Sequence, residues 1–275
     1  MSAVSSTLAG RKPIDYPPPP TPFTGGMNLQ NIPSDKSLSS VKHKGRLPNI
    51  RKLFRPEPGK YMCDSDLERA DAYVVAWDSG AEDLKAMFRS GADIHTENAK
   101  ALKVSRNQAK QGVHLTNYGG TPRVLALTLG ITIHEAERFQ RRWFQVHPQI
   151  KVWHNEILMQ LAGRRYVENR FGYRRYYFGR PDSDLKEALA WIPQSTVACV
   201  INRGWVNLEK NLPWVKCKIQ VHDSIVYEIP QSHLRDRKEI KKQLEIIVPY
   251  EDPLLIPIGF SYSEESWGLV KELEW

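Results

Sequence analysis

Four side chains that could bind a charged, aromatic ligand recur at every fourth position: Arg106, Lys110, His114 and Tyr118. At 3.6 residues per turn, each step of four turns the direction by about 40°, so all four project from one side of a helix. Two cations followed by two rings could bind a triphosphate and continue into a stacking surface. A solvated basic face with a buried aromatic end has the same spacing and is the commoner arrangement in an arbitrary helix.

Two acids form a second candidate site, because each lies at the end of a predicted strand. Asp66 follows an apolar strand end, and Asp223 lies at the tip of a predicted hairpin. Carboxylates brought together at one sheet edge repel each other unless cations neutralise them, and hard oxygen ligands select Mg²⁺. A pair of such ions can run in-line phosphoryl transfer. Acids at strand ends are also ordinary turn residues, so neither pattern decides the function alone.

The strands that must position Asp223 are the clearest elements of the sequence. Residues 215–221 alternate apolar and polar side chains, which predicts a half-buried strand. A second strand over residues 224–229 follows, so His222 and Asp223 are expected at the tight turn between them. A helix and a further strand are expected to complete an antiparallel sheet with helices on one face, at residues 233–246 and 254–260.

Helical patterns dominate the middle of the chain. Thr132 with Glu135 forms a capping box that opens a long helix, which Pro148 breaks or kinks and Gly163 ends. Residues up to about 60 are rich in Pro, Gly and Ser and read as irregular chain. The remaining expectations are a basic hairpin over residues 164–178 and helices over residues 67–77, 81–90, 96–104, 106–118 and 183–210, the last interrupted at Pro193.

Composition restricts the class of protein. The chain has 275 residues, of which 41% are apolar and 25% charged, and this excludes a mainly disordered or fibrous chain. No apolar run approaches the ~18 residues of a membrane span, so no membrane partner is expected. Three scattered cysteines favour a reducing compartment, and the cytoplasm (the host cell cytoplasm if the protein is viral) is the expected location. The net charge of +8 permits a polyanionic partner.

With their flanks, these residues resemble the palm and fingers of family A DNA polymerases, the group of bacterial DNA polymerase I and many phage replicases; the phage-type members are the expected relatives. The resemblance covers nearly the whole chain, from Gly10 to Trp267. Its motifs, in order, are residues 28–33 (Asn-Leu-Gln-Asn-Ile-Pro), motif A at 66–73, Asp-Ile-His at 93–95, motif B at 106–119, Gln194 after Pro193, motif C at 220–223 and the Ser266-Trp267 tail.

The resemblance implies an α+β fold, with an antiparallel palm sheet, packed helices and a mostly helical fingers subdomain. Residues 1–90 would form the N-terminal palm part with motif A, residues 91–182 the fingers with motif B, and residues 183–275 the C-terminal palm part with motif C. It implies no thumb or 3′–5′ exonuclease domain in this chain. A separate polypeptide or a missing N-terminal region would carry them.

The implied activity is template-directed DNA synthesis in replication, in which deoxynucleoside triphosphates (dNTPs) are added to a primer 3′-hydroxyl on primer–template DNA. By resemblance, Asp66 and Asp223 would hold two Mg²⁺ ions, with the carbonyl of Leu67 as an extra ligand. One ion would activate the primer hydroxyl and the other would hold the triphosphate. Asp66 is preferred to Asp64 because only Asp66 lies five residues before the acidic Asp71.

The resemblance also assigns the residues that bind substrate. Arg106 and Lys110 would bind the phosphates, with Lys110 also a catalytic proton donor to pyrophosphate. His95 would contact the same phosphates, and Tyr118 would stack beside the templating position. The side chains implied to contact DNA are Arg11, Gln194 and His222.

Some positions depart from the family pattern. His114 stands where Phe or Tyr is usual, and Ser224 replaces the Glu that commonly follows His-Asp, so one acidic neighbour of the metal site is missing. Tyr73 stands in place of an Arg in motif A. Asp71 is expected to act as a steric gate against the sugar of the incoming nucleotide, with His114 on the facing helix holding it.

Two other functions compete with DNA synthesis. A single-subunit RNA polymerase shares the catalytic acids and the motif B helix, and it often reads His-Asp-Ser where this chain has residues 222–224. Residues 28–33, residues 93–95 and above all Asp71 favour DNA synthesis. The other alternative is an inactive or partial subunit that only binds DNA. An inactive subunit would not require both acids and both phosphate-binding cations, which this chain retains.

Overall fold

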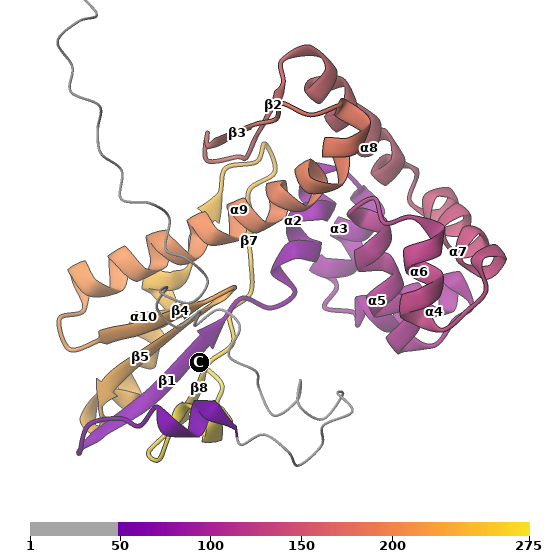
Figure 1. Ribbon diagram of the computed structural model, residues 1–275. Helices are drawn as coiled ribbons and strands as arrows, with labels where there is room; N and C mark the ends of the chain where they lie inside the picture. The colour runs from indigo at the N-terminus through magenta and orange to yellow at the C-terminus, as the bar shows by residue number, and fades with distance from the viewer. Residues whose placement is uncertain (1–48) are drawn as a thin grey trace, which may run out of the picture.

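The computed structural model describes residues 49–275; Arg11 and residues 28–33 lie outside the described residues. A five-stranded sheet lies at the lower left of Figure 1. Its order is β4-β5-β1-β8-β9, and every neighbouring pair is antiparallel. Its strands are β1 (Lys60–Asp66), β4 (Lys216–Val221), β5 (Ser224–Pro230), β8 (Ser261–Ser263) and β9 (Lys271–Glu272).

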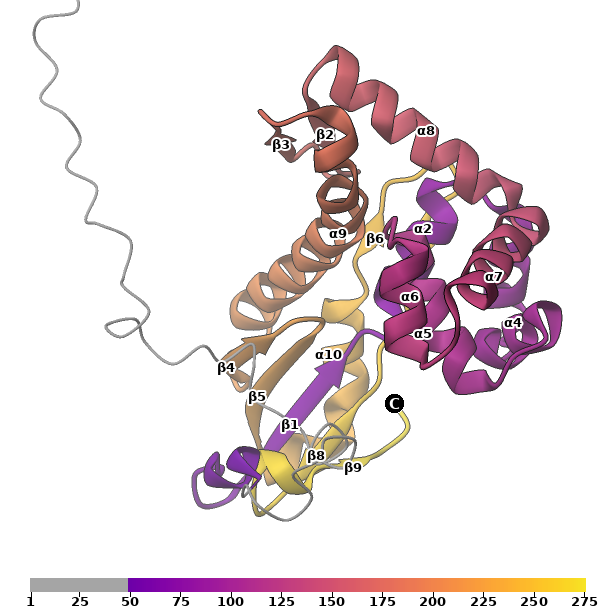
Figure 2. The same cartoon turned by 45° about the vertical axis from the view of Figure 1, so that its right-hand side comes forward.

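Two helices pack on one face of this sheet. The long helix α9 (Pro181–Asn211) runs along β4 and β5, and α10 (Arg237–Leu244) packs beside it (Figure 2). The opposite face carries a small apolar cluster made of Met62, Ile219, Val221, Val226 and Trp267. The α+β class, with helices on one face of an antiparallel sheet, is therefore confirmed.

A helical region stands beside the sheet and forms the right-hand part of Figure 1. Its core is continuous with that of the sheet, because buried residues from Cys63 in β1 to Trp153 in the last of these helices belong to one cluster. Its helices are α2 (Ala70–Asp78), α3 (Glu82–Arg89), α4 (Ile94–Leu102), α5 (Arg106–Asn117), α6 (Pro122–Leu129), α7 (Ile133–Val146) and α8 (Pro148–Gly163).

Local signals placed several of these boundaries correctly. The predicted capping box is present, with the Thr132 hydroxyl accepting from the backbone N–H of Glu135. Pro148 does separate two helices, and the basic hairpin forms from β2 (Tyr166–Glu168) and β3 (Arg174–Tyr176). No helix among residues 49–275 is long and apolar enough to cross a membrane.

The expected last strand over residues 254–260 is wrong. The only strand that forms there is β7 (Leu254–Leu255), which pairs with β6 (Ile247–Val248) outside the main sheet, and Ile258 makes an isolated antiparallel bridge with Leu67. Pro257 has no N–H to donate to a ladder, and its carbonyl instead accepts from the N–H of Glu68 at 2.8 Å. The strand that joins the main sheet is β8, which begins at Ser261.

Two other expectations needed correction, and one helix was not expected. The helix over residues 233–246 begins as a 3₁₀ turn, η3 (Gln231–Asp236), before α10. Pro193 is buried inside α9 without ending it, because packing along both sides maintains this long helix. Helix α6 was not predicted, although Thr121 as N-cap followed by Pro122 is a recognised start signal.

Candidate active site

The strand ends that carry Asp66 and Asp223 lie side by side. Asp66 pairs with Ser224 in the β1–β5 register, and the N–H of Leu67 donates to the carbonyl of Asp223 at 2.9 Å. Val221 pairs with Ser224, so His222 and Asp223 form the predicted two-residue turn. His222 adopts φ = 49°, the left-handed conformation that such a tight turn requires. The hairpin therefore brings the second acid to the end of β1.

The acids repel one another at this sheet edge. The pKa of Asp66 is raised by burial and then by the charge of Asp223. The pKa of Asp223 is also raised, first by burial and further by Asp71 and Asp64. Such a concentration of carboxylates favours a bound cation, which would relieve the repulsion.

The donor set fits Mg²⁺ held jointly with a phosphorylated substrate. Among residues 49–275, no three His, Cys, Asp or Glu side chains form a metal-binding cluster. Mg²⁺ commonly takes one or two carboxylates and completes its shell with water and substrate phosphates, and Asp66 with Asp223 supplies that number. One oxygen of Asp64, two residues before Asp66, is buried without a hydrogen-bond partner, and this carboxyl group feels the charges of both Arg51 and Asp66.

The predicted phosphate-binding residues gather at the start of α5. A capping box between Ser105 and Gln108 opens this helix, so its exposed Arg106 and Lys110 lie in the first two turns. His95 in the first turn of α4 lies close to both, since its pKa is lowered by burial and then by the charges of Lys110 and Arg106. The structure thus places these three residues together.

Asp93 organises this group, a role that sequence reasoning missed. Its carboxylate accepts from Arg106 Nε at 2.7 Å and from Nη2 at 3.3 Å, and this ion pair lowers the pKa of Asp93. It also caps α4 by accepting from the backbone N–H of His95 and the hydroxyl of Thr96. The pattern Asp-x-x-Thr before a helix was the available signal. Arg106 keeps a second guanidinium edge for a phosphate.

Asp71 bonds to Tyr118 and not to His114. The hydroxyl of Tyr118 donates to Asp71 Oδ2 at 2.7 Å, which joins α5 to the segment after Asp66. Burial, followed by the charge of Asp71, raises the pKa of Tyr118. His114 instead lies edge-on to the Tyr118 ring, with centroids 4.5 Å apart. The expectation that His114 holds Asp71 is therefore wrong. Tyr118, one helical turn after His114, holds Asp71 instead.

The two described residues that are expected to contact DNA are exposed. Gln194 is exposed on α9, and His222 is exposed at the hairpin tip. Tyr73, which replaces an Arg of the family pattern, is buried and stacks on Phe88 with centroids 3.9 Å apart. Tyr73 is therefore a core residue.

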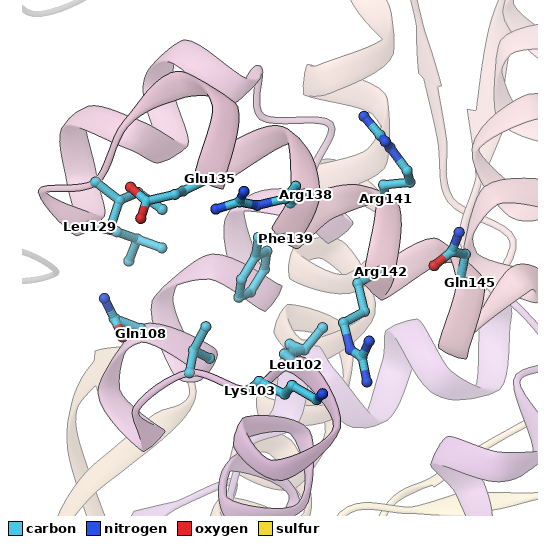
Figure 3. Close-up of a pocket in the computed structure, with 12 residues that line it drawn as sticks. Leu102, Lys103, Gln108, Leu129, Glu135, Arg138, Phe139, Arg141, Arg142 and Gln145 are labelled. Atoms are coloured by element: carbon cyan, nitrogen blue, oxygen red, sulfur yellow. The ribbon is translucent and has the colours of Figure 1, made fainter.

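Of two large cavities in the described part of the chain, one is lined by a predicted site residue and the other is not. Asp66 lines one of about 620 Å³, together with the C-terminal residues 272–275. Another, of about 550 Å³, lies among α4, α5 and α7 (Figure 3). Its floor includes Phe139, whose ring packs against Gly112 on α5, and none of the predicted site residues lines it.

The turn after α5 needs glycine, and this gives a stability prediction. A Cβ on Gly120 would lie 2.7 Å from the carbonyl oxygen of Leu115, a backbone atom that cannot move independently. We expect Gly120→Ala to lower the free energy of unfolding by about 1–3 kcal/mol. Gly163→Ala is the control, since nothing lies within 4 Å of its added methyl. Equal stability of the two variants in urea denaturation would contradict the close contact.

A comparison with protein-family models decides the family. Residues 25–264 match the model described as DNA polymerase family A. The chain belongs to DNA polymerase family A.

Curated relatives agree with the family A assignment. The thermostable DNA polymerase I of Thermus filiformis is 33% identical over 254 residues, which cover 84% of this chain and 29% of that protein. DNA polymerase I of Lactococcus lactis subsp. cremoris is 29% identical over 252 residues, covering 81% of this chain and 27% of that protein. This family A chain thus spans less than a third of the length of these relatives. Both are bacterial, so the expected phage-type relationship finds no support in them.

A solved structure matches the fold. The polymerase domain of Pol1 from M. smegmatis, in complex with DNA primer–template and dNTP, superposes with a TM-score of 0.76 at 20% identity. The match covers 88% of this chain and 45% of that one. At this identity the likeness establishes a shared family A polymerase fold.

Proposed function

We propose that this chain is the palm and fingers portion of a DNA-directed DNA polymerase that adds dNTPs to a primer 3′-hydroxyl in DNA replication. The observation that carries the proposal is the hydrogen bond between Tyr118 and Asp71. It ties the phosphate-binding helix α5 to the palm segment that begins at Asp66, beside Asp223. This connection supports the proposal that the acids, the cations and the ring of Tyr118 serve one site.

The proposed chemistry is nucleotidyl transfer assisted by two Mg²⁺ ions. When bound, the ions supply Lewis-acid activation of the primer hydroxyl and charge neutralisation at the leaving pyrophosphate. Asp66 and Asp223 hold and orient them, together with the Leu67 carbonyl. Arg106 and Lys110 bind the triphosphate with His95, and Lys110 donates a proton to the pyrophosphate oxygen.

The remaining assignments concern DNA and the rest of the enzyme. Gln194 and His222 contact primer or template, and Arg11 remains the proposed minor-groove contact. The proposed division keeps palm parts at 1–90 and 183–275 and fingers at 91–182. Protein outside these 275 residues, whether a separate polypeptide or an N-terminal segment, would grip the duplex. The proposed location is the cytoplasm.

Primer extension tests the proposal. The chain is incubated with a 5′-labelled primer–template, the four dNTPs and Mg²⁺, and the products are resolved by length. We expect templated addition that chelation of Mg²⁺ abolishes, with dissociation after few additions because duplex contacts supply much of the affinity. Extension with ribonucleotides alone would favour the RNA polymerase alternative. DNA binding without extension, even with a partner that supplies the thumb, would favour the inactive subunit.

A further inference from the structure

Asp64 lies on the same sheet face as the proposed metal-binding acids. Side chains two apart in a strand share a face, so Asp64 and Asp66 project together from β1, away from α9. In the register with β5, Asp66 lies opposite Ser224 and Asp64 lies opposite Val226. Asp64 is therefore diagonal to Ser224. It lies close enough to Asp66 and Asp223 for their charges to interact.

One oxygen of Asp64 is fixed by the C-terminal segment. Asp64 Oδ2 accepts from the indole N–H of Trp267 at 2.6 Å. Trp267 is only 1% exposed, and its backbone N–H donates to the carbonyl of Phe54 at 2.9 Å. The guanidinium of Arg51 lies 4.1 Å from the indole centroid. The carboxyl group of Asp64 is thus held in one orientation.

The other oxygen has no such partner. Asp64 Oδ1 is buried without a hydrogen bond of ordinary geometry, although the Ser224 side chain lies near enough to lower the pKa of Asp64. A buried polar atom without a partner is destabilising, so a side chain that served only to anchor Trp267 would gain nothing from a second carboxylate oxygen. An asparagine could accept the same indole hydrogen bond. Burial raises the pKa of Asp64, whereas the nearby Arg51 guanidinium favours its charged form.

We infer that Asp64 is a positioning residue that supplies, from β1, the acidic neighbour of the metal site that Ser224 does not supply from β5. This inference rests on the proposed function. The charge of Asp64 increases the affinity of the Asp66–Asp223 pair for divalent cations without binding the metal directly. Outer-shell groups of this kind typically change metal affinity by about 10- to 100-fold.

Three variants separate this role from a structural one. Asp64→Asn removes the charge but keeps an oxygen for the Trp267 indole. Trp267→Phe removes the indole N–H but keeps an aromatic ring beside Arg51. The double variant Asp64→Ser with Ser224→Glu moves the acid from β1 to β5, and Asp64→Ser alone is its reference.

The readout is Mn²⁺ affinity of the full chain with primer–template, measured by electron paramagnetic resonance of free Mn²⁺, with Tm measured in parallel. We expect Asp64→Asn to weaken Mn²⁺ binding about 10-fold or more with little change in Tm. Trp267→Phe should lower Tm but retain Mn²⁺ affinity. The double variant should recover affinity relative to Asp64→Ser alone.

Two results would overturn the inference: unchanged Mn²⁺ affinity in Asp64→Asn, or no recovery in the double variant. Asp66→Asn provides the reference for the proposed function itself. If Asp66→Asn also left Mn²⁺ affinity unchanged, the metal site would be misassigned and the proposed function would fail with it. If Asp66→Asn weakened binding and Asp64→Asn did not, only the role of Asp64 would be wrong.

Discussion

Replacing Asp66 or Asp223 by alanine is expected to lower the rate of primer extension at least ~10³-fold while DNA binding persists. The two acids lie on paired strand ends, where each has a raised pKa partly through charge repulsion from other carboxylates. Losing either one would remove a proposed ligand for the ions that, in the proposed mechanism, stabilise the transition state. The measurement is single-turnover extension at saturating dNTP, with primer–template binding followed separately by fluorescence anisotropy.

Glu137→Gln is a matched control for the loss of a carboxylate. Glu137 is exposed on α7, outside the group of acids at the sheet edge. We expect this variant to extend primers at the rate of the unaltered chain. Near-normal extension by Asp66→Ala or Asp223→Ala, in a preparation of proven activity, would refute the metal assignment.

The second large effect concerns the choice of sugar. Asp71 is held by the Tyr118 hydroxyl at 2.7 Å, so its carboxylate has a fixed position near the proposed nucleotide site. A ribose 2′-hydroxyl would collide with it or disrupt that hydrogen bond, and an unpaired buried polar group costs about 1–3 kcal/mol. We therefore expect Asp71→Ala to raise the ratio of kcat/KM for GTP to that for dGTP by about 5- to 150-fold.

Tyr118→Phe tests how the gate is held. It retains the stacking ring but releases Asp71, so we expect a smaller change in the same direction. If Asp71→Ala left the ratio of kcat/KM for GTP to that for dGTP unchanged, Asp71 would not be the steric gate. The proposed enzyme class would not be affected by that result. An unaltered chain that prefers GTP would instead support the RNA polymerase alternative.

Features encoded in short segments could be predicted from the sequence. The alternation over residues 215–221 and the strand after it were sufficient to place His222 and Asp223 in a turn, which the register confirms. Motif B required only helical spacing, and its helix begins at Arg106 as expected. These elements depend on neighbours within a few residues, where periodicity and capping carry the information.

Features that depend on distant partners could not be predicted. Asp64 and Trp267 are 203 residues apart in the chain, and their hydrogen bond exists only because the C-terminal segment packs against β1. Asp71 and Tyr118 are 47 residues apart, so spacing alone could not decide between Tyr118 and His114 as the partner. The short strand β8 is also defined by its pairing with β1 and β9, and its own sequence gives little strand signal.

The most direct test of the central claim is single-nucleotide insertion opposite each of the four template bases. The chain is given one dNTP at a time on four primer–templates that differ only at the templating position, with Mg²⁺ present. We expect each template base to select its Watson–Crick complement and Asp223→Ala to insert none of the four nucleotides. Insertion that ignores the template base, or insertion that survives in Asp223→Ala, would contradict a template-directed polymerase centred on Asp66 and Asp223.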